Sequence, residues 1–131
     1  MMKQRFSSGT KWEVTTGYSR AIRMGHRVLI SGTTATDKDG KIVGVGDGYK
    51  QTIQALRNIE SALQMAGADL INVVRTRVYV TDKNVWEEVA RAHGEFFGQI
   101  KPASSLIGIS WLVDPDMLVE IEAEAIISDE D

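Results

Sequence analysis

Few side chains in this 131-residue sequence are of a type that takes part directly in chemistry. The groups able to bind an anion, donate a hydrogen bond or move a proton are Tyr18, Arg20, Arg23, Ser31, Arg91, Ser104, Ser105 and Glu120. Taken singly, each is of a kind that also serves on a surface or in a structural contact. They predict a site only if the fold brings several of them together.

Several common kinds of site find little support in the sequence. There is no Cys, and no serine stands in the G-x-S-x-G motif of a nucleophilic hydrolase. His26 and His93 are far apart and lack the partners at ligand spacing that a metal site needs. The segment "GVGDG" at 44–48 fails the dinucleotide-binding pattern because Tyr49 replaces its third glycine. We therefore expect no metal and no cofactor.

Composition narrows the class of protein further. The chain has 15 basic and 18 acidic residues, a net charge of −3, and no basic stripe of the kind that binds nucleic acid. No apolar run approaches the ~18 residues of a membrane span, and the N-terminus does not read as a signal peptide. The absence of cysteine fits a reducing compartment. We expect a cytoplasmic protein with one domain over 1–131, irregular at 1–16 and ending in an acidic tail at 128–131.

Two amphipathic helices must position these residues. The segment "GYKQTIQALRNIESALQMAGA" places apolar side chains at three- and four-residue steps, with Asp47 as N-cap and Gly67 just after the C-terminus. A second helix is predicted within 83–100, with Asp82 as its N-cap. Both helices have one apolar face to bury.

Five short strands complete the pattern. Residues 19–25 and 27–33 predict a hairpin that turns at Gly25 and His26. Three further strands are predicted at 72–80, at 104–112 and at 117–127. The order ββ-α-β-α-ββ predicts an α+β two-layer sandwich, with two helices on one face of a mixed sheet.

The other face of the sheet carries charge. Strand alternation places Arg75, Arg77 and Tyr79 opposite the side that holds Val74, Thr76, Val78 and Val80. The same alternation separates Glu120, Glu122 and Glu124 from their apolar neighbours, so arginines and glutamates can pair across strands. Solvent is one explanation for such a face. Residues 105–111 are apolar on both faces, however, and this favours burial in a homo-oligomer.

Five segments of the chain resemble the RidA/YjgF family. They are "GYSRAI", "VLISGTTATDKDGKI", "TIQALRNIESALQMAGADLINVVRTRVYVTD", "FFGQIKPASSLIGIS" and "VEIEAEAI", in order from about Gly17 to Ile127. The resemblance implies a chorismate-mutase-like α+β fold and homotrimers with small-molecule clefts between subunits. The family includes 2-imino and enamino acid deaminases, and proteins described as translation inhibitors or endoribonucleases.

The resemblance also implies roles for particular residues. The family glutamate that positions the attacking water corresponds to Glu120, and the residues lining its cleft correspond to Tyr18, Ser31 and Gly32. Ser104, Ser105 and Leu106 occupy the start of the strand at which relatives bind substrate. The family's asparagine on the second helix is replaced by Ala90, with Arg91 next to it.

One departure from the family bears on substrate choice. Relatives have P-A-R-S where this chain has "PASS", so the arginine that clamps a substrate carboxylate is replaced by Ser104. Losing that bidentate pair should cost about 2–4 kcal/mol of binding. Either Arg20, Arg23 or Arg91 reaches the cleft instead, or the ligand is neutral or differently shaped.

The sequence therefore predicts a small-metabolite protein of this family that lacks the standard arginine-dependent deaminase site. If it is an enzyme, the expected reaction is hydrolysis of an imine, an enamine or a related C–N compound, with Glu120 catalytic. The alternative is a non-catalytic metabolite-binding or regulatory protein of the same fold. A ribonuclease is disfavoured because the chain is acidic.

Overall fold

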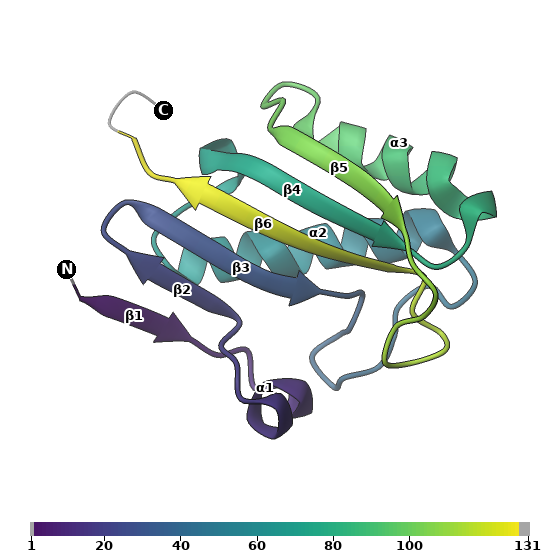
Figure 1. Cartoon of the computed structure of the whole chain (residues 1–131), viewed down its shortest axis with the longest axis horizontal. Helices are drawn as coiled ribbons and strands as arrows, with labels where there is room; N and C mark the ends of the chain where they lie inside the picture. The colour runs from purple at the N-terminus through teal and green to yellow at the C-terminus, as the bar shows by residue number, and fades with distance from the viewer. Residues whose placement is uncertain (1, 129–131) are drawn as a thin grey trace.

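The computed structural model describes residues 2–128, so residues 129–131 of the acidic tail lie outside the described part (Figure 1). The strands and helices are β1 (Lys3–Phe6), α1 (Lys11–Thr16), β2 (Ala21–Met24), β3 (Arg27–Thr33), α2 (Gly48–Met65), β4 (Val73–Val80), α3 (Trp86–Phe97), β5 (Ala103–Gly108) and β6 (Val119–Ile126). Short 3-10 turns at Leu70–Asn72 and Lys83–Val85 precede β4 and α3.

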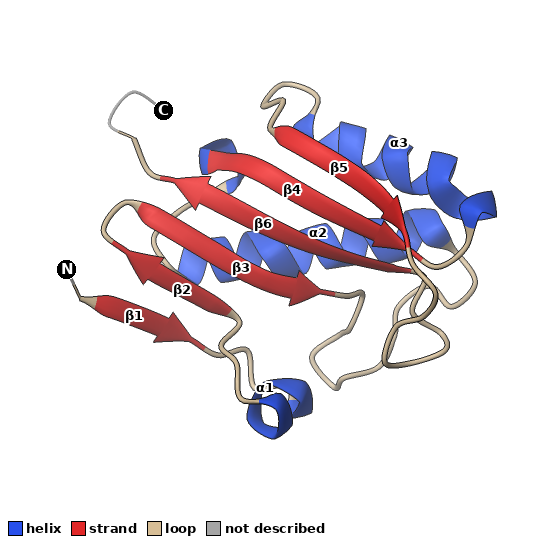
Figure 2. Cartoon of the chain, in the orientation of Figure 1, coloured by secondary structure: helices blue, strands red, loops and turns tan. Residues whose placement is uncertain are grey.

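The strands form one six-stranded sheet in the order β1-β2-β3-β6-β4-β5. Only β4 and β5 run parallel, and the other neighbouring pairs are antiparallel. Helices α2 and α3 lie together against one face of this sheet (Figure 2). The predicted α+β two-layer fold with a mixed sheet is confirmed.

Helix α2 follows its sequence signals. The Asp47 carboxylate accepts a hydrogen bond from the Lys50 N–H at 2.9 Å, and Gly67 adopts a φ of 81° just after the helix. Leu56, Ile59 and Leu63 are completely buried in the core between α2 and the sheet. Among residues 2–128, no helix is both long and apolar enough to cross a membrane.

The start of α3 and the first hairpin also follow the sequence, with one refinement. Asp82 caps the 3-10 turn at Lys83–Val85 rather than α3 itself, which begins at Trp86. In the hairpin, Met24 pairs with Arg27, and Gly25 takes a φ of 62° in the two-residue turn.

The prediction of an irregular segment over 1–16 is wrong in part. Residues 3–6 form the edge strand β1, and residues 11–16 form helix α1. Helix α1 has only six residues, and Val14 within it is 84 % exposed, so no apolar stripe marks it in the sequence. Its one buried side chain is an acid, Glu13.

Two details of the predicted strands are also wrong. Strand β5 ends at Gly108 rather than at 112, because Gly108 pairs with Val80, the last residue of β4. Trp111, expected in that strand, is 71 % exposed in the following loop. In β4 a register shift between Val73 and Arg75 buries Val73 and leaves Val74 exposed, which reverses the side expected for Val74.

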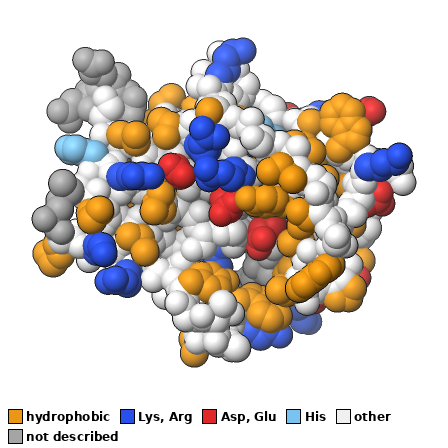
Figure 3. All heavy atoms as spheres, in the orientation of Figure 1, with side chains coloured by type: hydrophobic (Ala, Val, Ile, Leu, Met, Phe, Trp, Pro, Cys, Tyr) orange, Lys and Arg blue, Asp and Glu red, His pale blue; other side chains and the backbone are white. Residues whose placement is uncertain are grey.

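The face of the sheet away from α2 and α3 carries the predicted charges (Figure 3). The Glu124 carboxylate forms ion pairs with Arg77 from β4 and Arg27 from β3, each with a nitrogen–oxygen distance of 3.4 Å. The prediction that arginines and glutamates pair across strands is confirmed. These partly exposed pairs contribute little to the free energy of unfolding, at most about 1 kcal/mol each.

Candidate functional site

A cavity of about 1000 Å³ opens beside β3, β6 and the N-terminal helix. Four of the site residues expected from the sequence line it: Tyr18, Ser31, Gly32 and Glu120. The loop at 34–40 and the neighbouring face of α2 complete its wall. Segments from both ends of the chain therefore converge on one hollow.

Gly32 makes room for the carboxylate of Glu120. A Cβ placed on Gly32 would lie 2.8 Å from Cδ of Glu120, closer than Cβ atoms come to other atoms in proteins. The pairing of β3 with β6 is irregular between Ile30 and Thr33, and this bulge places Gly32 under the acid. The glycine is needed here for space rather than for its backbone freedom.

The surroundings of Glu120 make it a stronger base than an ordinary carboxylate. Burial raises the pKa of Glu120, and the nearby charge of Glu122 raises it further. Arg20 acts in the opposite direction and lowers that pKa, although by less. A partly buried carboxyl with a raised pKa is the kind of group that general acid–base catalysis uses.

Tyr79 and Glu122 form a second polar pair in the same cavity. The Tyr79 hydroxyl donates a hydrogen bond to Glu122, and this bond, together with burial, raises the pKa of Tyr79. Tyr79 is the cross-strand partner of Glu120. The cavity wall therefore holds two carboxylates on β6 with a phenol from β4 between them.

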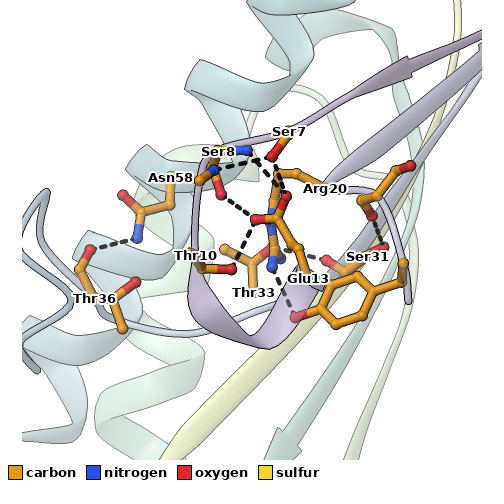
Figure 4. Close-up of polar contacts among 12 residues, drawn as sticks. Ser7, Ser8, Thr10, Glu13, Arg20, Ser31, Thr33, Thr36 and Asn58 are labelled. Carbon is orange, nitrogen blue, oxygen red and sulfur yellow. Dashed lines mark hydrogen bonds and ion pairs between the residues drawn. The ribbon is translucent and has the colours of Figure 1, made fainter. Parts of the chain in front are cut away.

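Arg20 is a buried residue of the cavity lining and has several hydrogen-bond partners (Figure 4). Its Nη1 donates to the Gly32 carbonyl at 2.6 Å and to the Thr33 hydroxyl at 3.0 Å. Its Nη2 donates to the Tyr18 hydroxyl at 3.1 Å. Arg20 thus links Tyr18 to the bulge in β3 that contains Gly32.

The charge of Arg20 is balanced by Glu13, whose carboxylate lies 3.5 Å from Nε in a buried ion pair. Burial alone would raise the pKa of Glu13, but hydrogen bonds from Ser8, Thr10 and Ser7 lower it to about 2. Glu13 therefore stays ionised at neutral pH. Sequence reasoning missed this residue, and the cluster "SSGTKWE" of hydroxyl residues before an acid is the only signal that could have found it.

Ser104, Ser105 and Leu106 lie elsewhere, on the exposed edge strand β5. Leu106 lines a second, shallower hollow of about 480 Å³, which Lys83 and Trp86 also border. Ser104 pairs with Thr76, whose side chain is buried on the helix side, whereas Glu120 pairs with Tyr79 on the charged side. Because they lie on opposite faces of one sheet, Ser104 and Glu120 cannot meet within a single subunit.

Comparison with known proteins identifies the family. A family model described as Endoribonuclease L-PSP matches residues 9–127. The chain belongs to this family. It is the YjgF/RidA family that the sequence resembled, because a solved relative, Rv2704 from Mycobacterium tuberculosis, is described as a member of the YjgF/YER057c/UK114 family.

Rv2704 is 44 % identical to this chain, with a TM-score of 0.87 over 96 % of this chain and 100 % of the relative. The RutC family protein PH0854 from Pyrococcus horikoshii is 40 % identical over 109 residues, which cover 82 % of this chain and 85 % of the relative. Escherichia coli TdcF, solved with bound serine, is 25 % identical, with a TM-score of 0.78 over 85 % and 88 % of the two chains.

Within this YjgF/RidA chain, each of the three arginines that could replace the family arginine is engaged by groups other than Ser104. Arg20 donates to Gly32, Thr33 and Tyr18. Arg23 donates to the Gly25 carbonyl at 2.9 Å and to the Ala66 carbonyl at 2.7 Å, near the C-terminus of α2. Arg91, expected beside the ligand, lies over the Tyr49 ring on the outer side of α2 and α3, 4.4 Å from its centroid.

The described residues also bear on metal binding. Within residues 2–128, no three His, Asp or Glu side chains come close enough together to hold a metal ion. The cavity lining provides carboxylates, phenols and hydroxyls, together with the cations Lys11, Arg20 and Lys38. Such groups bind small organic molecules and move protons.

Proposed function

We propose that this protein binds a small nitrogen-containing metabolite and hydrolyses its C=N bond, with Glu120 as the catalytic group. The observation that carries the proposal is the Glu120 carboxylate, held over Gly32 in a large cavity with its pKa raised by burial. A relative of this chain, TdcF, was solved with serine bound, which supports a metabolite-sized ligand.

In the proposed reaction, Glu120 accepts a proton from water as the water oxygen attacks the imine carbon. The resulting carbinolamine carries a hydroxyl and an amine on one carbon. The imine enters protonated, so its nitrogen already carries two hydrogens in the carbinolamine, and Glu120 returns to that nitrogen the proton taken from water. The C–N bond then breaks as the hydroxyl proton passes back to Glu120 and on to solvent, and the products are a carbonyl compound and ammonia. General base catalysis of this kind accelerates a reaction by about 10²–10⁴-fold.

The complete site is proposed to lie between subunits of a homotrimer. Glu120 and Ser104 occupy opposite faces of one sheet, so a neighbouring subunit must supply the second half of the site. The edge strand and the loop after it support such an interface, since Leu106 and Ile107 in β5 are each about 40 % exposed and Trp111 in the loop is 71 % exposed. Apolar exposure of this extent on an unpaired strand edge favours association.

The preferred substrate is proposed to lack a carboxylate. Ser104 carries no charge, and Arg20, Arg23 and Arg91 are all held by other groups in the subunit. Without a bidentate arginine, an α-imino acid loses about 2–4 kcal/mol of binding relative to its binding in relatives, or on the order of 10²–10³ in preference.

The test uses two imines made in the assay by flavin oxidases. One is 2-iminopropionate, from alanine, and the other is the carboxylate-free phenylmethanimine, from benzylamine. We expect faster carbonyl release from the second, and a fall of about 100-fold or more in Glu120→Gln. If both imines hydrolyse no faster with the protein than in buffer alone, the proposal that it is an imine hydrolase is contradicted.

The loss of the arginine also favours the alternative, a non-catalytic protein that binds or senses a metabolite. Under that alternative, Glu120→Gln binds its ligand as the unmodified chain does and keeps the biological effect. Under the proposed hydrolysis, the same substitution removes turnover and leaves binding largely intact.

A further inference from the structure

A hydrogen-bonded chain leads from the exposed Ser104 into the protein. The Thr76 hydroxyl, which is completely buried, donates to Oγ of Ser104 at 2.7 Å. The same Thr76 oxygen lies 2.8 Å from Nε2 of His93. Three elements, β5, β4 and α3, thus contribute one residue each to a relay that the proposed mechanism does not use.

Counting protons links the two hydrogen bonds of the relay and allows two directions. A threonine hydroxyl has one proton, so when Thr76 gives it to Ser104, Nε2–H of His93 donates to Thr76, and in the other direction Ser104 donates inward. The first direction is the one that gives Ser104 a free proton for a ligand. The proton of Ser104 is then directed away from Thr76. Because aligned hydrogen bonds polarise one another, this outward O–H is a better donor than an isolated serine hydroxyl.

The relay is uncharged at neutral pH. Burial lowers the pKa of His93, and its ring packs against Phe97 with 4.7 Å between the two centroids. A neutral relay offers a directed hydrogen bond without a positive charge. One neutral donor does not offset the cost of removing a carboxylate from water, which a charged arginine would do, whereas a neutral acceptor costs much less to bury.

We propose that Ser104, aligned by Thr76 and His93, donates the hydrogen bond that holds an uncharged acceptor on the ligand, either a carbonyl oxygen or an imine nitrogen. This inference rests on the proposed function and names the chemistry of the second half of its site. Ser104 contacts the ligand, and Thr76 and His93 are positioning residues that act through it.

The experiment compares two probes of nearly equal size, pyruvamide and pyruvate, titrated into the full-length protein by NMR. We expect pyruvamide to bind more tightly than pyruvate. Loss of one neutral hydrogen bond in Ser104→Ala should weaken pyruvamide binding about 5–10-fold. Thr76→Val should have a similar effect because valine keeps the shape of threonine and removes its hydroxyl.

Rescue and matched controls separate alignment from packing. Thr76→Ser keeps the hydroxyl and should restore pyruvamide binding, which a purely steric role for Thr76 does not explain. Thr52→Val is the control, since Thr52 is also completely buried and bonds only within α2, to the Gly48 carbonyl at 2.7 Å. It should leave pyruvamide binding unchanged. Pyruvate binding should change little in any variant.

The outcomes separate this inference from the proposed function. Suppose that imine hydrolysis depends on Glu120 but that neither Ser104→Ala nor Thr76→Val changes pyruvamide binding. That result overturns the relay and leaves the proposed function in place. Absence of pyruvamide binding together with absence of imine hydrolysis overturns both. If Thr76→Val fails to fold, Ser104→Ala alone decides, because Ser104 is exposed and can be replaced by water.

Discussion

The cavity beside Gly32 and the edge of β5 both carry candidate site residues, but they satisfy their polar groups in different ways. At the cavity, Arg20 and Glu13 are buried and each has several partners: Gly32, Thr33 and Tyr18 for Arg20, and Ser7, Ser8 and Thr10 for Glu13. At the β5 edge, Ser104 is exposed and is hydrogen-bonded to one buried residue, Thr76. The first region is complete within a subunit, whereas the second presents a surface.

This difference indicates where each region obtains its stability. Removing a member of the buried network leaves an uncompensated charge inside the protein, which is costly. Removing a group at the exposed edge lets water take its place. Substitutions in the cavity should therefore affect folding as well as function, and those at the edge should affect function alone.

The largest effect is expected for Arg20→Met, which removes the cation beside the buried carboxylate of Glu13 and leaves it with its hydrogen bonds alone. The free energy of unfolding should fall by about 3–5 kcal/mol, measured by urea denaturation. The double variant Arg20→Met/Glu13→Gln should recover part of this loss. A loss below 1 kcal/mol would mean that the ion pair is not a buried structural contact.

Acid should weaken the cavity region through Glu13. Because the pKa of Glu13 is lowered to about 2 from 4.5, its contribution is complete above pH 4.5 and is lost as the pH falls toward 2. The contribution is about 3 kcal/mol. Unfolding free energies measured from pH 5 to pH 2 should decline more steeply in the unmodified protein than in Glu13→Gln.

Gly32→Ala tests the contact on which catalysis is proposed to depend. The added Cβ must displace the Glu120 carboxylate, and a shift of about 1 Å costs on the order of 10²-fold in rate. The control is Gly94→Ala in α3, where a Cβ would meet nothing within 4 Å. Equal imine hydrolysis in both variants would contradict the proposed placement of Glu120.

Glu122→Gln should change the pH dependence of hydrolysis rather than its maximum. Glu120 must be ionised to accept a proton, so the rate falls as the pH drops through its raised pKa. Glu122 is one cause of that raised pKa, and removing its charge should shift the acid limb of the rate profile to lower pH. A shift in the other direction would show that Glu122 acts on Glu120 in some other way.

The smallest effect on folding is expected for Ser104→Ala. Its hydroxyl is exposed, so the free energy of unfolding should change by less than about 0.5 kcal/mol. Thr10→Ala, which removes one hydroxyl from the Glu13 cluster, should cost about 1 kcal/mol by the same urea measurement. Similar losses in both variants would remove the distinction between the two regions.

Local signals in the sequence were sufficient for the main elements. The apolar periodicity, the cap at Asp47 and the glycine at 67 predicted α2, and the two-residue turn predicted the first hairpin. The same signals failed for α1, which is short and buries only an acid. They also failed at the end of β5, because the length of a strand depends on where its neighbour stops.

The candidate site divides in the same way. Family motifs led to Tyr18, Ser31, Gly32 and Glu120, and the structure places all four on one cavity. Glu13 lies outside those motifs and outside any apolar periodicity. Only its contacts with Arg20 and with the nearby hydroxyls show that it balances the charge of Arg20. The sequence did not predict the relay from Ser104 either, because Thr76 and His93 lie on different elements and belong to no motif that links them.

The sequence by itself determined the family, the α+β order of elements, the charged face of the sheet and the replacement of the family arginine by Ser104. These depend on residue type and on spacing along the chain, which local physics translates directly into strands, helices and faces. Only the tertiary structure decided that Arg20 is balanced by Glu13, that Gly32 makes room for Glu120, and that Glu120 and Ser104 lie on opposite faces of one sheet. Those facts depend on strand register and on contacts between distant segments, which no pattern along the chain specifies.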